Sequence, residues 1–294
     1  MADIAEIRLA VPPSIDEAVD ELTRHRGRAQ IVAGGTDLTL ALRRSREWPD
    51  VFIMVGNLAE LRAIREDGGG VEIGASVTMT ELTDSAVIRH RYTALAEAAR
   101  TVGGVQIRNA ATVGGNVCNA SPGADTPPAL LALRAVVEIG GAGGRRSVDL
   151  EQFFLGPRRT VLDAGELLAG FRLPSPPPRS GSAYLRLTPR EALDLAIVGV
   201  AAAVTLAADR RTVAHCRVAL GAVAPTPLVV AEAGDQLAGR ILDAATLAEA
   251  GRRAAEACRP IDDVRATAAY RRRMVPVLVE RAIAIAVSRA ATEA

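Results

Sequence analysis

Two glycine-rich stretches of the sequence carry the residue types best suited to bind an anion. The first, Gln30–Leu42, consists of a short apolar segment, a Gly-Gly-Thr-Asp turn and the beginning of an apolar helix. A glycine turn between a strand and a helix N-terminus directs backbone N–H groups and the positive end of the helix dipole to one place. This stretch therefore predicts a site for a phosphate or diphosphate group.

The second stretch, Gln106–Leu133, repeats this chemistry with more polar side chains. Gly114 and Gly115 allow positive φ angles and close approach of the backbone. Asp125 is the only charged residue of the stretch besides Arg108, and its carboxylate could accept a hydrogen bond from a ribose hydroxyl. Short hydrogen-bonding side chains surround the glycines: Thr112, Asn116, Asn119 and Ser121. Two such loops suggest one diphosphate held from two sides by successive backbone N–H groups.

Neither stretch is a standard nucleotide motif. No Gly-Lys-Ser/Thr follows either double glycine, which excludes a Walker loop, and neither contains the GxGxxG fingerprint of the Rossmann fold. Taken alone, each Gly-Gly pair could be ordinary turn chemistry. The ligand prediction therefore depends on the two loops meeting in space.

Capping and hydrophobic spacing predict the elements that position these loops. Ser14 with Glu17 and Thr78 with Glu81 have the spacing of capping boxes and predict two helix starts. Short apolar runs predict strands before the Pro-rich segment at 174–178, which ends regular structure. These strands are expected at 31–32, 51–55, 61–65, 71–73, 135–139 and 167–173.

Beyond the Pro-rich segment, the sequence predicts an antiparallel sheet packed against two helices. The strands are expected at 184–187, 196–206 and 213–223, and the helices at 243–258 and 267–290. In the third strand, a single buried face is predicted by an alternation of Ala214, Cys216, Val218 and Leu220 with His215 and Arg217.

The two glycine stretches together resemble the FAD-binding medium subunit of molybdenum hydroxylases, the family that includes xanthine and carbon monoxide dehydrogenases. The family pattern has an AGG-[TS]-[DE/S]-L loop followed by a T-[IV]-GGN-[IV]-x-[NH]-A-x-P-x-[AS]-D loop. This chain has AGGTDL at 33–38 and TVGGNVCNASPGAD at 112–125, in the same order and at the expected separation. Similarity at 165–168 and 184–198 extends the resemblance over essentially the whole chain.

The resemblance implies an α+β chain with the two-subdomain FAD-binding fold of the vanillyl-alcohol oxidase (PCMH) type, followed by a C-terminal α+β domain with an antiparallel sheet and helices. The expected division is 1–57 for FAD-binding subdomain 1, 58–174 for subdomain 2, 175–182 for a Pro-rich linker and 183–294 for the C-terminal domain.

The resemblance also implies a set of FAD contacts. Tyr184 and Arg186 stand where the family often has a tyrosine and a lysine. Arg186 keeps the positive charge but not the compact ammonium, and the two residues could instead belong to an ordinary strand with one exposed cation. Val102 stands where the family can place a larger apolar residue. The other implied contacts are Val32, Ala33, Gly34, Gly35, Thr36, Asp37, Leu38, Thr112, Gly114, Gly115, Asn116, Asp125 and Leu168.

The implied function is electron transfer within a complex. FAD is expected to bind noncovalently, because the two loops contain no His or Tyr and Cys118, the only candidate for attachment, is expected to be buried. Molybdopterin and 2Fe-2S clusters are expected only in partner chains, a large molybdenum-cofactor subunit and a small 2Fe-2S subunit, in a dimer of heterotrimers. No catalytic acid, base or nucleophile is indicated, and the substrate and the electron acceptor (NAD, quinone or oxygen) stay open.

Composition narrows the remaining possibilities. The net charge is +1 and aromatic residues make up 3% of the chain, so nothing indicates a nucleic-acid partner. Cys118, Cys216 and Cys258 lie far apart and show no metal-site spacing, so no metal is expected. The longest apolar run, 195–208, is too short to cross a bilayer, and no targeting signal opens the chain, so we expect a cytoplasmic protein.

Two other functions remain open on the sequence alone. One is a stand-alone flavin-dependent oxidoreductase of the same fold, which would need its own substrate pocket and general base. The other is a nucleotide-binding scaffold without redox function, which would fold without taking up a flavin.

Overall fold

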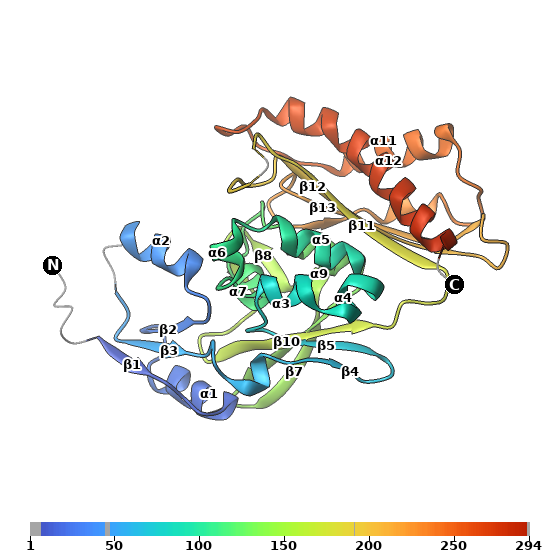
Figure 1. Ribbon diagram of the computed structural model, residues 1–294. Helices are drawn as coiled ribbons and strands as arrows, with labels where there is room; N and C mark the ends of the chain where they lie inside the picture. The colour runs from blue at the N-terminus through green and yellow to red at the C-terminus, as the bar shows by residue number, and fades with distance from the viewer. Residues whose placement is uncertain (1–6, 45–47, 191, 293–294) are drawn as a thin grey trace.

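The computed structural model describes residues 7–44, 48–190 and 192–292. Within these ranges the chain forms three structural units in sequence order, each built on a β-sheet (Figure 1). An additional two-stranded sheet consists of β8 (Phe154–Gly156) and β9 (Arg159–Thr160). The α+β class and the C-terminal antiparallel sheet with its helices agree with the expectation from the sequence.

The N-terminal unit is a small parallel sheet of three strands, with one helix between the first and second strands of the sequence and another between the second and third. α1 begins after Ser14, whose hydroxyl accepts a hydrogen bond from the Glu17 N–H at 3.2 Å. The apolar stripe of α1 shares a core with Val51 and Ile53 in the central strand of the sheet, and with Leu167 and Ala169 of a later strand. The elements are β1 (Arg8–Ala10), α1 (Ile15–Arg24), β2 (Ala29–Val32), α2 (Thr36–Arg44) and β3 (Val51–Met54), with strand order β1-β3-β2.

The second unit is a five-stranded antiparallel sheet with short helices. Its strand order is β4-β5-β10-β6-β7, so β10, the last strand in sequence, lies at the centre. The strands are β4 (Ile64–Glu66), β5 (Gly70–Gly74), β6 (Val136–Gly141), β7 (Gly144–Asp149) and β10 (Glu166–Pro174). The helices are η2 (Ala59–Leu61), α3 (Met79–Asp84), α4 (Ala86–Arg91), α5 (Thr93–Thr101), α6 (Val105–Arg108), α7 (Val113–Cys118), α8 (Thr126–Ala132) and α9 (Leu150–Phe153).

Two local predictions in this unit have different outcomes. The capping box at the start of α3 is complete, because Thr78 accepts from the Glu81 N–H and the Glu81 carboxylate accepts from the Thr78 N–H at 2.7 Å. The strand expected at 61–65 was wrong in its first half. Leu61 ends the 3-10 helix η2 and packs in the N-terminal core, and the strand begins only at Ile64.

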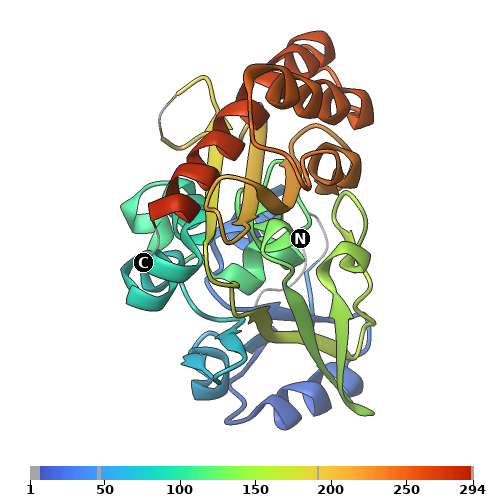
Figure 2. The ribbon, with the colours of Figure 1, turned by 90° about the vertical axis from the view of Figure 1, so that its right-hand side faces the viewer.

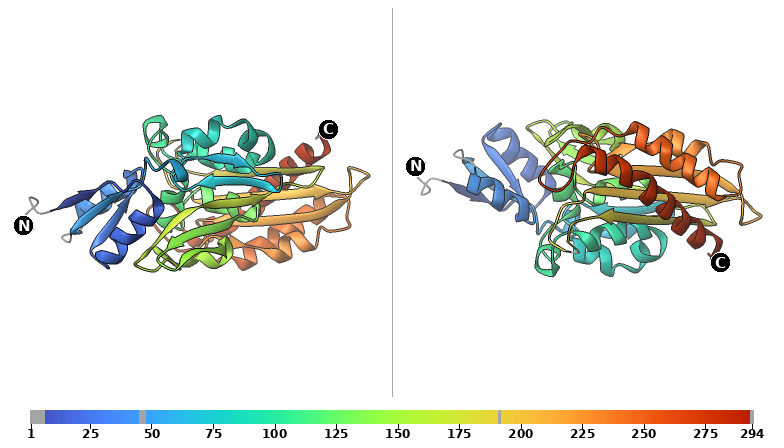
Figure 3. Two further views of the ribbon diagram at one scale, coloured as in Figure 1. Left: turned by 90° about the horizontal axis from the view of Figure 1, so that it is seen from below. Right: turned by 90° about the horizontal axis from the view of Figure 1, so that it is seen from above.

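The third unit is a four-stranded antiparallel sheet of order β11-β12-β13-β14 with helices over one face (Figures 2 and 3). α12 packs on β11 and β12, and α11 packs against α12. β10 ends at Pro174, directly before the range 175–182 expected for the linker. β11 begins at Ser180, which lies inside that range. The elements are β11 (Ser180–Leu187), β12 (Val198–Leu206), β13 (Val213–Gly221), β14 (Leu228–Val229), α10 (Ala231–Asp235), α11 (Ala244–Ala257) and α12 (Ala268–Thr292).

The single buried face predicted for the strand at 213–223 was wrong. Val218, Ala219 and Leu220 are consecutive in β13 and are all buried. The reason is that α8 of the second unit packs on β12 and β13, so Ala219 joins the core of the second unit while Val218 and Leu220 join that of the third. The sheet is thus sandwiched between its own helices and the second unit.

Candidate functional site

A cavity of about 860 Å³ lies where the three units meet, and both glycine stretches line it. The third unit contributes Arg190, the segment 193–195 and Arg265, which the sequence analysis did not nominate. Of the predicted site residues, those on the cavity wall are Val32, Ala33, Gly34, Gly35, Thr36, Asp37, Leu38, Val102, Thr112, Gly114, Gly115, Asn116, Asp125 and Leu168. Tyr184 and Arg186 are not on this wall.

Two glycines on the wall stand where a neighbouring backbone segment comes too close for a side chain. A Cβ atom on Gly34 would lie 1.9 Å from the carbonyl oxygen of Ala110, and one on Gly114 would lie 2.6 Å from that of Ala75. Gly35 has φ +70°, a left-handed conformation that glycine adopts without strain, and it stands directly before α2. The glycines therefore permit backbone packing that a larger residue at these positions would prevent.

The first loop presents free donors to the cavity. The first N–H groups of a helix have no partner within the helix. Among the described residues, the N–H groups of residues 34–38 donate to no acceptor. Residues 34–38 line the cavity, so backbone donors without a partner lie at its wall.

The second stretch differs from the prediction of two equivalent loops. Residues 113–118 form helix α7, capped by Thr112, whose hydroxyl accepts from the Gly115 N–H at 3.1 Å. The Gly114 N–H donates to Ala75 O at 2.9 Å and the Asn116 N–H to Thr112 O at 3.0 Å. Because these donors are used within the chain, α7 shapes the cavity and does not offer these N–H groups to an anion.

Asp37 and Asn119 join the two stretches. The Asn119 side-chain amide donates to Asp37 Oδ2 at 3.2 Å. Burial raises the pKa of the Asp37 carboxyl group above its ordinary value, and the positive charge of Arg158 opposes this rise. The carboxylate therefore stands on the wall next to the free N–H groups.

Asp125 is held by two residues of β11. The Tyr184 hydroxyl donates to Asp125 Oδ1 at 2.7 Å and Arg186 Nη1 donates to Oδ2 at 3.0 Å. The side chains of Asp125 and Arg186 are each only 6% exposed, which rules out the alternative of an exposed cation on an ordinary strand. Burial raises the pKa of Asp125, and Arg186 opposes this effect. Tyr184 and Arg186 thus fix Asp125 from behind the wall.

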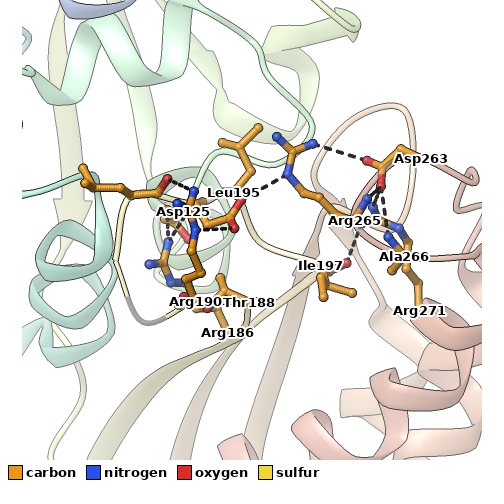
Figure 4. A network of polar contacts seen from close by, with 12 residues as sticks. Asp125, Arg186, Thr188, Arg190, Leu195, Ile197, Asp263, Arg265, Ala266 and Arg271 are labelled. Atoms are coloured by element: carbon orange, nitrogen blue, oxygen red, sulfur yellow. Dashed lines mark hydrogen bonds and ion pairs between the residues drawn. The ribbon is translucent and has the colours of Figure 1, made fainter.

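Two loops of the third unit carry alternating charges across the cavity edge (Figure 4). Arg190 and Arg265 both bind Asp194, with N–O distances of 3.2 Å and 3.3 Å. Arg265 also pairs with Asp263 at 3.5 Å, and Asp263 pairs with Arg271 at 2.7 Å. The charged residues after β11 were the only sign of this network in the sequence. Their partner Arg265 lies some seventy residues later, so local patterns could not reveal the contact.

Comparison with known proteins identifies the family. The family described as "FAD binding domain in molybdopterin dehydrogenase" matches residues 5–176, and the "CO dehydrogenase flavoprotein C-terminal domain" matches residues 183–286. The chain belongs to the FAD-binding subunits of the molybdenum hydroxylase family. The family, the α+β fold class and FAD as the cofactor, all expected from the sequence, are confirmed.

Relatives of this FAD-binding subunit cover nearly its whole length. The carbon monoxide dehydrogenase medium chain of Hydrogenophaga pseudoflava is 34% identical over 95% of this chain and 96% of its own. The xanthine dehydrogenase FAD-binding subunit of Escherichia coli O157:H7 is 32% identical over 90% of each chain.

Solved structures give the same result. Carbon monoxide dehydrogenase from H. pseudoflava matches with a TM-score of 0.92 and 33% identity, covering 97% of this chain and 98% of the other. Quinoline 2-oxidoreductase from Pseudomonas putida 86 matches with a TM-score of 0.89 and 28% identity over 97% and 98% of the two chains.

The cavity of this FAD-binding subunit suits FAD in size and chemistry. Its volume lies within the range typical of ligand pockets, and bare glycine backbone with free N–H groups lies beside apolar residues such as Leu168 and Val102. No group of three or more His, Cys, Asp or Glu side chains that could hold a metal occurs among the described residues. In the same residues, no helix is long and apolar enough to cross a membrane.

Proposed function

We propose that this chain is the FAD-carrying electron-transfer subunit of a multi-subunit molybdenum hydroxylase. The observation that carries the proposal is the cavity between the three units, which is lined both by residues 34–38, whose N–H groups are free, and by the glycine-bearing start of α7. When bound, FAD would supply the redox chemistry, accepting electrons and passing them on. Family membership disfavours the scaffold alternative, and the names of the relatives, which include medium chains and FAD subunits, disfavour a stand-alone oxidoreductase.

The roles of the site residues follow from their positions. The first loop would bind the diphosphate through its N–H groups, and the glycines Gly34 and Gly114 would keep the backbone walls close. Asp125 would accept hydrogen bonds from the cofactor at the wall, with Tyr184 and Arg186 as positioning residues. We propose the cavity-lining residues named above as FAD contacts, with 1–57, 58–174 and 183–294 as the structural domains and 175–182 as the linker.

The partners would carry the other cofactors. We place molybdopterin in a large subunit and 2Fe-2S clusters in a small subunit, assembled with this chain as a dimer of heterotrimers in the cytoplasm. The names of the relatives support a multi-chain enzyme, since they include a carbon monoxide dehydrogenase medium chain, a nicotine 6-hydroxylase medium subunit and a nicotinate dehydrogenase FAD-subunit. Because related subunits serve such different substrates, specificity would reside in the large subunit.

The first test is the cofactor content of the purified chain. A visible flavin spectrum, with FAD released by acid precipitation, is the expected result for noncovalent binding. The Gly34→Ala variant should not bind FAD, because its Cβ would collide with the Ala110 carbonyl. Gly143→Ala, at the tip between β6 and β7 with no atom within 4 Å, is the matched control and should bind normally. A folded wild-type chain that takes up no FAD, alone or with its partners, would refute the proposed function.

A further inference from the structure

The cavity wall is poor in uncommitted positive charge. Among the described residues, three arginines line the cavity: Arg158, Arg190 and Arg265. Arg190 forms an ion pair with Asp194, and Arg265 forms ion pairs with both Asp194 and Asp263. The guanidinium group of Arg158 makes no hydrogen bond or ion pair with any described residue. Arg158 is therefore the cavity-lining cation that is available to a ligand.

The turn between β8 and β9 holds Arg158 in place. Arg158 has φ +58°, and its backbone N–H donates to the carbonyl oxygen of Ala120 at 3.0 Å. Ala120 is itself left-handed, with φ +44°, and belongs to the stretch that follows α7. Left-handed φ angles are uncommon outside glycine. Two such residues bonded to each other attach the Arg158 turn to the second glycine-rich stretch.

The charge balance of the wall shows what this cation could do. The free N–H groups of residues 34–38 are partial charges, and the nearby carboxylate of Asp37 is negative. The positive charge of Arg158 acts on Asp37, since it opposes the effect of burial on the Asp37 pKa. A diphosphate would add two further negative charges beside that carboxylate. Such an anion calls for a full positive charge close by.

We propose that Arg158 is the cation that neutralises the diphosphate of the bound cofactor, and that its charge also offsets the charge of the Asp37 carboxylate nearby. The inference rests on the proposed function, because it takes the diphosphate of FAD as the anion. It assigns Arg158 to the binding site although it lies outside both glycine stretches. It also explains why an acid stands at the diphosphate end of the cavity, where its charge alone would repel the ligand.

The test is FAD affinity of the full-length chain after removal of its flavin, measured by quenching of flavin fluorescence at low and high salt. Arg158→Gln should weaken FAD binding roughly tenfold or more, the loss expected for one charge-assisted contact. Its affinity should also depend less steeply on salt, because one screened attraction is gone. Arg159→Gln removes the neighbouring exposed arginine, which does not line the cavity, and should bind FAD as the wild type does.

A double-mutant cycle separates charge compensation from a structural role. Asp37→Asn should restore part of the affinity in the Arg158→Gln background, because the uncompensated carboxylate no longer repels the diphosphate. Arg158→Lys keeps the charge and should retain most of the affinity, which decides the matter if Arg158→Gln proves unstable by circular dichroism.

Two results would overturn the inference. One is an Arg158→Gln variant that binds FAD as tightly as Arg159→Gln, and the other is an Asp37→Asn effect of the same size in both backgrounds. Failure of the wild-type chain to bind FAD would instead count against the proposed function itself.

Discussion

At the scale of single residues, the buried contact between Asp125, Tyr184 and Arg186 should dominate the stability of the cavity wall. Asp125→Asn removes the charge that compensates Arg186 at a site where both side chains are 6% exposed. Loss of one partner of a buried ion pair destabilises proteins by about 3 kcal/mol. Tyr184→Phe removes one hydrogen bond and should lower the free energy of unfolding by about 1 kcal/mol.

Urea unfolding of the FAD-free variants measures both effects. The control is Asp50→Asn, which breaks the exposed ion pair with Arg28 and should change the free energy of unfolding by less than about 1 kcal/mol. Equal effects of Asp125→Asn and Asp50→Asn would show that the buried triad is not coupled as its geometry indicates.

The three cysteines provide a second prediction at this scale. Burial raises the pKa of Cys118 and of Cys216 to about 12, and that of Cys258 to about 11. Since the thiolate is the reactive form, the native thiols should react with a disulfide reagent at pH 8 on the order of a thousandfold more slowly than free cysteine. Reaction should become fast in guanidinium chloride, when all three pKa values return to the ordinary range. Cys118 is half-buried on the cavity wall, so rapid labelling of it in the native chain would contradict its assignment as a neutral thiol.

At the scale of elements, the free edge of β11 is closed by side chains. The Tyr184 N–H donates to Glu97 of α5 at 2.8 Å, and Glu97 also pairs with Arg289 of α12, which donates to the Ser182 carbonyl at 2.6 Å. Glu97→Ala leaves a part-buried N–H without a partner and should lower the free energy of unfolding by about 2 kcal/mol. Glu97→Gln keeps an acceptor and should lose about half as much.

Thermal and urea unfolding of these variants test the edge closure. Glu249→Ala on α11 breaks only exposed ion pairs and serves as the control, with an expected change below about 1 kcal/mol. If Glu97→Ala were no more harmful than Glu249→Ala, the edge of β11 would not depend on this contact.

The same scale separates what sequence patterns could predict from what they could not. The strand, glycine turn and helix of β2 and α2 were predictable, because capping and periodicity act within a few residues. The second stretch was misjudged in detail, because the use of the Gly114 N–H depends on Ala75, a distant residue. The second buried face of β13 likewise depends on α8, and the charged loops at the cavity edge meet only through tertiary packing. Local rules thus gave the elements, and long-range contacts decided which groups remain free.

At the scale of the whole molecule, the cavity lies at the interface of three units, because each unit contributes part of its wall. A ligand that binds only the assembled wall stabilises the folded chain through mass action, by about 2.7 kcal/mol at a hundredfold excess over the dissociation constant. FAD should therefore tighten the junctions between the units in addition to the first loop itself. A site confined to one unit would leave the others unaffected.

Hydrogen exchange measured by mass spectrometry with and without FAD distinguishes these cases. We expect slower exchange in peptides covering residues 32–38, whose N–H groups would gain an acceptor, and also in peptides covering residues 192–196 of the third unit. Peptides from α11, which does not line the cavity, should exchange at the same rate in both states and provide the internal control. Protection restricted to residues 32–38 would mean that the first loop binds the cofactor without stabilising the interface between the units. In that case the charged loops at the cavity edge would have to be ordered by something other than FAD, and a partner chain docking on the third unit would be the next candidate to examine.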